Sequence, residues 1–134
     1  MSDQQPPATN KARSFQEVDL AAMRQTLSPG DRVIGIDFGD RKIGLAISDG
    51  MRSVASPVET LVRGKKFADD APRLQQIFEE RDVRAIVLGW PLQMDGMPGP
   101  RCQATIAFAR NLRTLAGIDL PTLLWDERLT SRMV

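Results

Sequence analysis

Two acidic features of the sequence each follow directly on a short apolar stretch. Asp37 comes after the apolar residues 33–36, and the pair Asp126-Glu127 comes after residues 122–125. Carboxylate oxygens are the ligands that Mg²⁺ prefers, and two carboxylates can hold the ion with water and phosphate oxygens completing the octahedron. Metal ions held in this way polarise a phosphate group and activate a water for in-line attack. The pattern therefore favours metal-assisted phosphate chemistry.

Each carboxylate also has a plain structural interpretation. Asp37 could be an ordinary turn residue, because Asp is common in turns, and Glu127 could form a solvated ion pair with Arg128. For either residue alone the two interpretations are about equally good. The occurrence of both acids directly after predicted strands favours the site.

The sequence contains no histidine, and its one cysteine is Cys102. The absence of histidine excludes a histidine general base, Ser-His and Cys-His nucleophiles, and the usual histidine-rich metal sites. A single cysteine allows no intrachain disulfide, and we interpret Cys102 as a packing residue. Any catalysis therefore falls to carboxylates.

The 134 residues are enough for one domain with a single core. No apolar run approaches the roughly 20 residues that span a bilayer, and the first ten residues lack the apolar stretch of a secretory signal. The net charge of +1 neither demands nor excludes a nucleic-acid partner. We therefore expect a cytoplasmic protein with no membrane partner.

The elements that position the acids begin after an expected disordered tail, residues 1–13. Ser14 and Glu17 form a capping-box pattern, and Phe15, Val18, Ala22, Met23 and Leu27 then fall on one helical face. The segment 28–31 ends that helix. We expect residues 14–31 to be an added helix and turn before the main domain at 32–134.

The main domain is expected to be α/β. Three strands are predicted first, over 33–36, 43–48 and 53–61, with a turn at 38–41 and with Pro57 at a sheet edge. They are followed by a helix over 67–81 and a strand over 85–88. The last two predicted elements are a helix with Ile106, Ala109, Leu112 and Leu115 on its apolar side and a strand over 122–125. Helices that alternate with strands imply parallel pairing. Asp37, Gly89 and Asp126-Glu127 should then share the carboxyl edge of the sheet, where such sheets bind ligands.

Two further features could belong to this edge. The loop 89–96 is long for an α/β connection, and we favour a functional role over a packed surface loop by a small margin. The basic segments Arg63-Gly64-Lys65-Lys66 and Arg41-Lys42 could contact phosphates. Solvated surface is the interpretation we weigh higher for both basic segments.

Four segments together resemble the YqgF family, also called RuvX, whose members are described as Holliday junction resolvases and as nucleases of the ribosomal RNA precursor. They are IGIDFG at 34–39, KIGLA at 42–46, GWPL at 89–92 with MDG at 94–96, and DERLT at 126–130. Any one of these motifs is weak, whereas four in this order are highly specific. The resemblance spans Val33 to Thr130.

The resemblance implies a ribonuclease H-like fold: a five-stranded mixed sheet of order 3-2-1-4-5, strand two antiparallel, flanked by helices. It implies Asp37 and Glu127 as the catalytic and metal-binding carboxylates, with Mg²⁺ or Mn²⁺ as cofactor. Since neighbours on a strand point to opposite faces, only one of Asp126 and Glu127 can join Asp37, and the resemblance favours Glu127. Substrate contacts are assigned to Arg41, Lys42, Asp95 and Arg128. The implied partner is nucleic acid, with the 5′ end of pre-16S rRNA as the substrate.

The sequence departs from the family pattern in its loop and at its end. Trp90 stands where Leu is usual, and Met97 stands near a usual Ser or Thr. Family members continue past the Asp-Glu-Arg motif into a helix that carries another metal-binding Asp, whereas this sequence ends at Val134. We therefore expect the domain to be truncated at its C-terminus and the chain as it stands to hold metal ions poorly.

Three competing functions are kept. Residues 36–39 and 43–46 also resemble the first phosphate loop of the actin, Hsp70 and sugar kinase superfamily, but the length leaves no room for the second lobe that clamps ATP. The missing third Asp favours a non-catalytic nucleic-acid-binding module. Cleavage of branched DNA as a Holliday junction resolvase is the third alternative, because phosphate-directed chemistry does not encode a preference for RNA or DNA.

Overall fold

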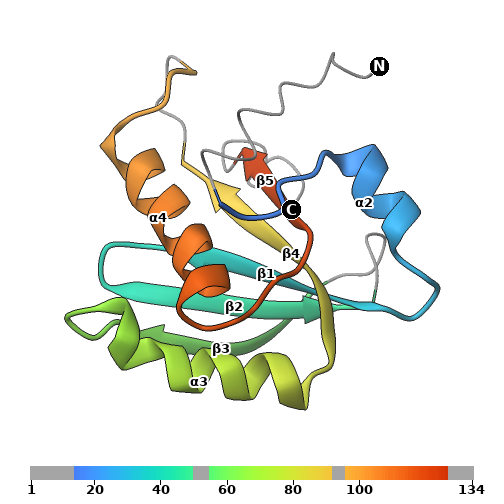
Figure 1. Cartoon of the computed structure of the whole chain (residues 1–134), viewed down its shortest axis with the longest axis horizontal. Coiled ribbons are helices and arrows are strands. Elements are labelled where there is room, and N and C mark those ends of the chain that lie inside the picture. The colour runs from blue at the N-terminus through green and yellow to red at the C-terminus, as the bar shows by residue number, and fades with distance from the viewer. Residues whose placement is uncertain (1–13, 50–54, 92–95, 127–134) are drawn as a thin grey trace.

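A computed structural model describes residues 14–49, 55–91 and 96–126, so the predicted tail at 1–13 lies outside the described residues. The elements are α2 (Leu20–Thr26), β1 (Arg32–Phe38), β2 (Lys42–Ser48), β3 (Ser56–Val62), α3 (Phe67–Glu80), β4 (Val83–Trp90), α4 (Pro100–Thr114) and β5 (Thr122–Asp126) (Figure 1). Among the helices in these ranges, none has the length and apolar character that crossing a membrane requires.

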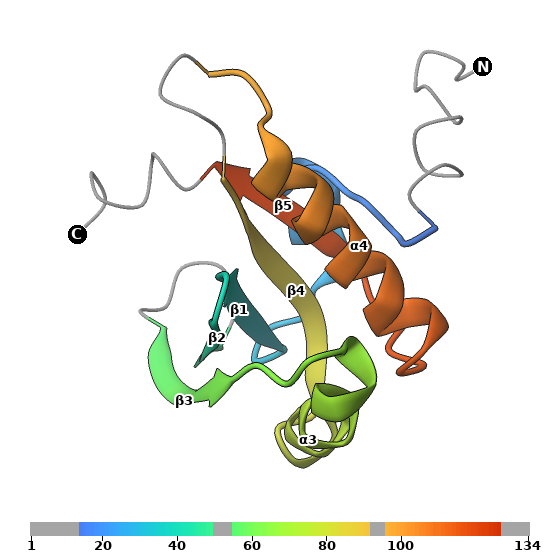
Figure 2. The ribbon, with the colours of Figure 1, turned by 90° about the vertical axis from the view of Figure 1, so that its left-hand side faces the viewer.

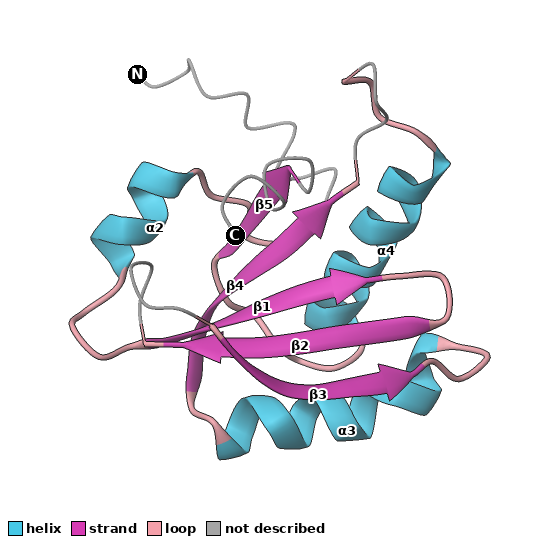
Figure 3. Ribbon diagram, turned by 180° about the vertical axis from the view of Figure 1, so that it is seen from behind, coloured by secondary structure: helices cyan, strands magenta, loops and turns pink. Residues whose placement is uncertain are grey.

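The five strands form one mixed sheet of order β3-β2-β1-β4-β5 (Figure 3). β2 is antiparallel to β1 and β3, whereas β4 is parallel to β1 and β5. The predicted order and the antiparallel second strand are confirmed. Pro57 lies in β3, the edge strand, where its missing N–H costs no central ladder bond.

The main core lies between one face of the sheet and the helices α3 and α4, which Figure 2 shows on the same side. Every second side chain of β1 points into this core, namely Ile34, Ile36 and Phe38. The Phe38 ring stacks on Phe108 of α4 with centroids 4.3 Å apart. Leu115 was expected on the apolar side of α4, but it is 63% exposed. The buried stripe of α4 passes through Phe108, Ala109 and Leu112 and continues to Ala116, which is 8% exposed, so Leu115 falls beside it.

A smaller core covers the opposite face. Met23 of α2 is fully buried and packs with Val33, Ala85 and Leu123, which lie near the starts of β1, β4 and β5. The helix α2 therefore covers the amino ends of the parallel strands on this face.

The predicted start of this helix at Ser14 is wrong. Asp19 is the N-cap, and its carboxylate accepts a hydrogen bond of 2.8 Å from the Ala22 amide, whereas Ser14 has a φ of 58°. The residues before Asp19 extend along β5, where the Thr122 amide donates to the Gln16 carbonyl and the Val18 amide donates to the Thr122 carbonyl. These strand-type hydrogen bonds occupy backbone groups that a longer helix would need.

Strands β1 and β4 are longer than predicted. Asp37 was expected to end the first strand, but it lies inside β1, paired with Gly44 of β2. The antiparallel ladder continues to Phe38 and Ile43, and the Gly39 amide closes the turn on the Lys42 carbonyl at 2.9 Å. Gly89 likewise lies within β4. The predicted start of the third strand, 53–54, falls outside the described residues.

We predict that Met23→Ala lowers the free energy of unfolding by about 2 to 5 kcal/mol, because it leaves a cavity in the smaller core. Urea denaturation measures this. Gln25→Ala, an exposed change on the same helix, should stay within about 0.5 kcal/mol of the parent. Equal changes in the free energy of unfolding would show that the packing of α2 does not stabilise the sheet.

A second prediction concerns the ion pair that joins β3 to α3. The Arg73 guanidinium donates to both carboxylate oxygens of Glu59, with Nε to Oε2 at 3.1 Å, and these hydrogen bonds lower the pKa of Glu59. A carboxylate with a lowered pKa stabilises the fold above its ordinary pKa of 4.5, and that contribution disappears as the pH falls through the lowered value.

Glu59→Gln should therefore flatten the acid side of the curve of melting temperature against pH. Glu79→Gln, at an exposed position of α3, should retain the parent curve. A parent-like acid dependence in Glu59→Gln would contradict the assignment to this pair.

Candidate active site at the carboxyl edge of the sheet

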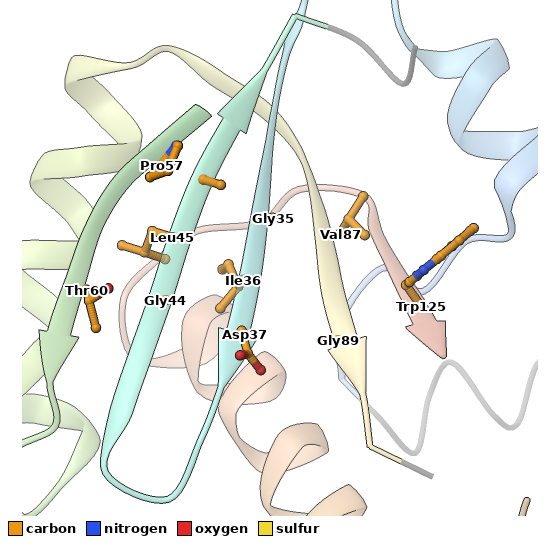
Figure 4. A pocket seen from close by; sticks show the side chains of 11 residues that line it. Gly35, Ile36, Asp37, Gly44, Leu45, Pro57, Thr60, Val87, Gly89 and Trp125 are labelled. Atoms are coloured by element: carbon orange, nitrogen blue, oxygen red, sulfur yellow. The ribbon is translucent and has the colours of Figure 1, made fainter. Parts of the chain in front are cut away.

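Asp37 projects from β1 on the face away from α3 and α4. Its neighbours Ile36 and Phe38 are buried in the main core, so alternation turns the Asp37 side chain to the other face, where it is exposed. Figure 4 shows its carboxylate directed away from the sheet. Gly44, its partner on β2, has no side chain to cover it, and a Cβ there would lie 3.7 Å from the Asp37 Cβ.

Asp37 lines a hollow of about 590 Å³ on this face. Its lining includes three glycines, Gly35, Gly44 and Gly89, and Trp125 stands at the β5 side (Figure 4). The small core under α2 lies at the amino ends of β1 and β4 and reaches Trp125 on β5, and Asp37 is not part of it. Within the described ranges, the carboxyl end of this face is therefore open above Asp37.

The three strand ends meet as the sequence predicts. Ile36 is paired with Leu88, and Gly89 is paired with Trp125, so Asp37, Gly89 and Trp125 lie on one level across β1, β4 and β5. With neighbouring strands about 4.8 Å apart, the Cα atoms of Asp37 and Trp125 are about 10 Å apart. Trp125 lines the same hollow as Asp37, and alternation therefore directs Asp126 to the opposite face.

A metal site needs more ligands than the described residues bring together. Those residues hold no group of three or more acidic, histidine or cysteine side chains near enough to share an ion. Asp37 does offer an exposed carboxylate beside open space, the donor type that suits a hard cation. The site is therefore compatible with Mg²⁺ or Mn²⁺ once a second carboxylate joins Asp37.

Of the other predicted site residues, Arg41 and Lys42 are described and exposed. Lys42 alternates with Ile43, which points into the main core, so its side chain leaves β2 on the same face as Asp37. Asp95, Glu127 and Arg128 lie outside the described residues.

The loop after β4 is described only in part. Pro91 is buried, and Gly96 has a φ of 86°. Cys102 is 2% exposed and its thiol contacts the Pro91 carbonyl at 3.5 Å, as expected of a packing residue.

Arg63 is a residue whose role the sequence did not reveal. Its Nη1 donates to the carbonyls of Gly39 and Asp40 at 2.8 and 3.0 Å, and its guanidinium lies 4.3 Å from the centre of the Phe38 ring. Arg63 therefore fixes the turn that follows Asp37. No local pattern indicates this contact, because the partners are 24 and 23 residues away in the sequence.

Three similar proteins of known sequence share one name. A protein of Ruegeria pomeroyi is 51% identical over 105 residues, which are 78% of this chain and 66% of the relative. One of Ruegeria sp. (strain TM1040) is 52% identical over 99 residues, 74% and 61% of the two chains. One of Roseobacter denitrificans is 52% identical over 113 residues, 84% and 69%. All three are named "Putative pre-16S rRNA nuclease".

Among solved structures, RuvC of T. thermophilus in complex with a Holliday junction substrate superposes with a TM-score of 0.53. The match covers 78% of this chain and 70% of RuvC at 13% sequence identity, and it establishes a RuvC-like ribonuclease H fold.

The matched segment spans about two thirds of the length of the first two relatives. The family model described as "RuvX: Holliday junction resolvase" matches residues 31–134, which include Asp37 and every strand of the sheet. Together with relatives about 50% identical, this match shows that the chain belongs to the RuvX family.

Proposed function

We propose that the complete protein is a metal-dependent nuclease that hydrolyses phosphodiester bonds and processes the 5′ end of pre-16S rRNA. The observation that carries the proposal is the position of Asp37, an exposed carboxylate over a glycine-lined hollow, level with the ends of β4 and β5. The name shared by the relatives supports ribosomal RNA as the substrate.

Asp37 and Glu127 are the proposed catalytic residues and metal ligands. The alternation of β5 supports this choice against Asp126, because Trp125 lines the hollow together with Asp37 and Asp126 is therefore directed to the opposite face. A bound Mg²⁺ or Mn²⁺ would polarise the scissile phosphate and activate a water.

Arg41, Lys42, Asp95 and Arg128 are the proposed substrate contacts. The exposure of Arg41 and Lys42, and the side of β2 from which Lys42 projects, support contacts between these cations and phosphate groups beside Asp37. The glycine-lined floor supports a close approach of the nucleic-acid backbone to the sheet.

Asp37→Asn in the complete gene product should reduce Mg²⁺- or Mn²⁺-dependent cleavage of a pre-16S rRNA leader by roughly 100-fold or more. Loss of a residue that only supports a metal ligand already costs about 10- to 100-fold, and loss of a ligand itself should cost at least that. The assay follows 5′-labelled RNA on denaturing gels, with a four-way DNA junction as a second substrate.

Glu79→Gln, an exposed acid-to-amide change on α3, is the control and should retain parent activity. Full cleavage by both Asp37→Asn and Glu127→Gln would overturn the site. Binding without cleavage by the folded parent protein would instead favour a non-catalytic module. Cutting confined to the four-way junction would favour a resolvase acting on DNA.

Access to Asp37 can be tested with a graded series at Gly44. Gly44→Ala should be mild, because the added Cβ would make an ordinary 3.7 Å contact with the Asp37 Cβ. Gly44→Val should reduce cleavage by about 10- to 100-fold, since small displacements of a bound substrate are costly. Valine suits a strand, so circular dichroism should show a retained fold.

Ala46→Val adds bulk on the same strand and the same face, two residues farther from Asp37, and is the control for added volume in the hollow. It should cost less activity than Gly44→Val. Parent-level cleavage by Gly44→Val would show that the substrate does not approach Asp37 across β2.

A further inference from the structure

A second, basic pocket lies on the helix side of the strand end that carries Asp37. It encloses about 200 Å³ between the end of β1, the β3–α3 loop and α4, and its polar lining residues are three cations, one acid and an amide: Arg63, Lys65, Lys66, Asp70 and Asn111. Phe38 forms part of its wall and directly follows Asp37, with its side chain on the opposite face of β1. The basic pocket and the open hollow therefore flank one strand end.

Positive charge predominates around the β1–β2 turn and the β3–α3 loop. The turn 39–42 and the loop and first helical residues 63–70 together carry five basic and three acidic residues. The two chain segments are adjacent, because the Arg63 amide donates to the Arg41 carbonyl at 2.8 Å and β2 pairs with β3 through Lys42 and Val62. Figure 1 shows the β1–β2 turn and the β3–α3 loop at the same end of the sheet.

The nearby acids do not neutralise these cations by ion pairing. The Asp69 carboxylate accepts from the Lys66 amide at 3.1 Å, and the Asp70 carboxylate accepts from the Gly64 amide at 3.0 and 3.2 Å. A side chain at Gly64 would collide with Asp69, so a glycine is needed there. No ion pair to Lys65 or Lys66 is found in the described part of the chain.

Arg63 is held in place before any ligand arrives. Its Nη1 contacts and its position over Phe38 fix the guanidinium, and its Nε and Nη2 donors have no acceptor among the described residues. A fixed guanidinium with free donors suits phosphate oxygens, since it loses little conformational entropy on binding.

Three phenylalanine rings line the pocket, and the half-buried one, Phe67, packs edge-on against Phe108 with centroids 5.8 Å apart. Phe38 and Phe108 are 9% and 3% exposed, and the Phe38 ring is already in contact with Phe108 on one side and with Arg63. Neither ring is therefore free to stack on a base, the contact that single-strand-binding proteins commonly use.

We propose that this basic pocket binds a phosphate group of the nucleic-acid strand whose scissile bond lies at Asp37. The identity of the ligand rests on the proposed nuclease function. The strand would cross the end of β1 from the open hollow to the basic pocket, past the turn that carries Arg41 and Lys42.

The test measures binding of fluorescent single-stranded RNA and DNA oligonucleotides to the complete gene product by anisotropy, over a series of salt concentrations and without divalent ions. The double change Lys65→Ala with Lys66→Ala should weaken binding by a similar factor for every sequence. The slope of log K against log salt should become shallower by about 0.7 for each phosphate group that the protein no longer neutralises.

The matched control is Arg24→Ala with Arg81→Ala, which removes the same charge from exposed positions on α2 and at the end of α3. It should leave the slope at the parent value. Two results would overturn the proposal for the basic pocket: an equal loss of affinity in both double variants, or an unchanged salt slope in the lysine variant. If the parent protein binds and cuts, the proposed nuclease function would still stand. A parent protein that neither binds nor cuts would overturn both proposals.

Discussion

Side-chain alternation along β1 is the constraint on which the rest of the molecule depends. Ile34, Ile36 and Phe38 are committed to the core beneath α3 and α4, so Gly35 and Asp37 must face the other way. A shift of one residue in the pairing with β2 would bury the Asp37 carboxylate and expose three large apolar side chains. The apolar core therefore fixes the direction of the one carboxylate described at the candidate site, and stability and function depend on the same register.

The face of the sheet that carries Asp37 is loosely packed, whereas the face under α3 and α4 is densely packed. Glycine at 35, 44 and 89 leaves space for a ligand backbone, although glycine in strands is unfavourable through its larger loss of conformational entropy. The main core on the reverse side and the small core around Met23 offset that cost. Arg63 makes the end of β1 more rigid, because its hydrogen bonds connect the loop before α3 to the turn after Asp37.

Much of this arrangement could be predicted from the sequence, since the period-two pattern of Ile43, Leu45 and Ile47 identifies a strand directly and the motif resemblance supplies the strand order. The start of α2 could not be predicted, because Ser14 and Asp19 are both good caps and only the contact of residues 16–18 with β5 decides between them. The role of Arg63 was hidden for a related reason: its partners are distant in sequence, and an isolated basic segment resembles ordinary surface. Glu127 and Asp95 lie outside the described residues, so their roles stay predictions.

Asp37 is the residue that we propose to bind a divalent cation at the carboxyl edge of the sheet. The most direct measurement is a titration of the complete gene product with Mn²⁺, followed by electron paramagnetic resonance of the free ion, for the parent and for Asp37→Asn. This role of Asp37 predicts saturable Mn²⁺ binding by the parent and a loss of that binding in Asp37→Asn at unchanged circular dichroism. Equal Mn²⁺ binding by the two folded proteins would contradict it.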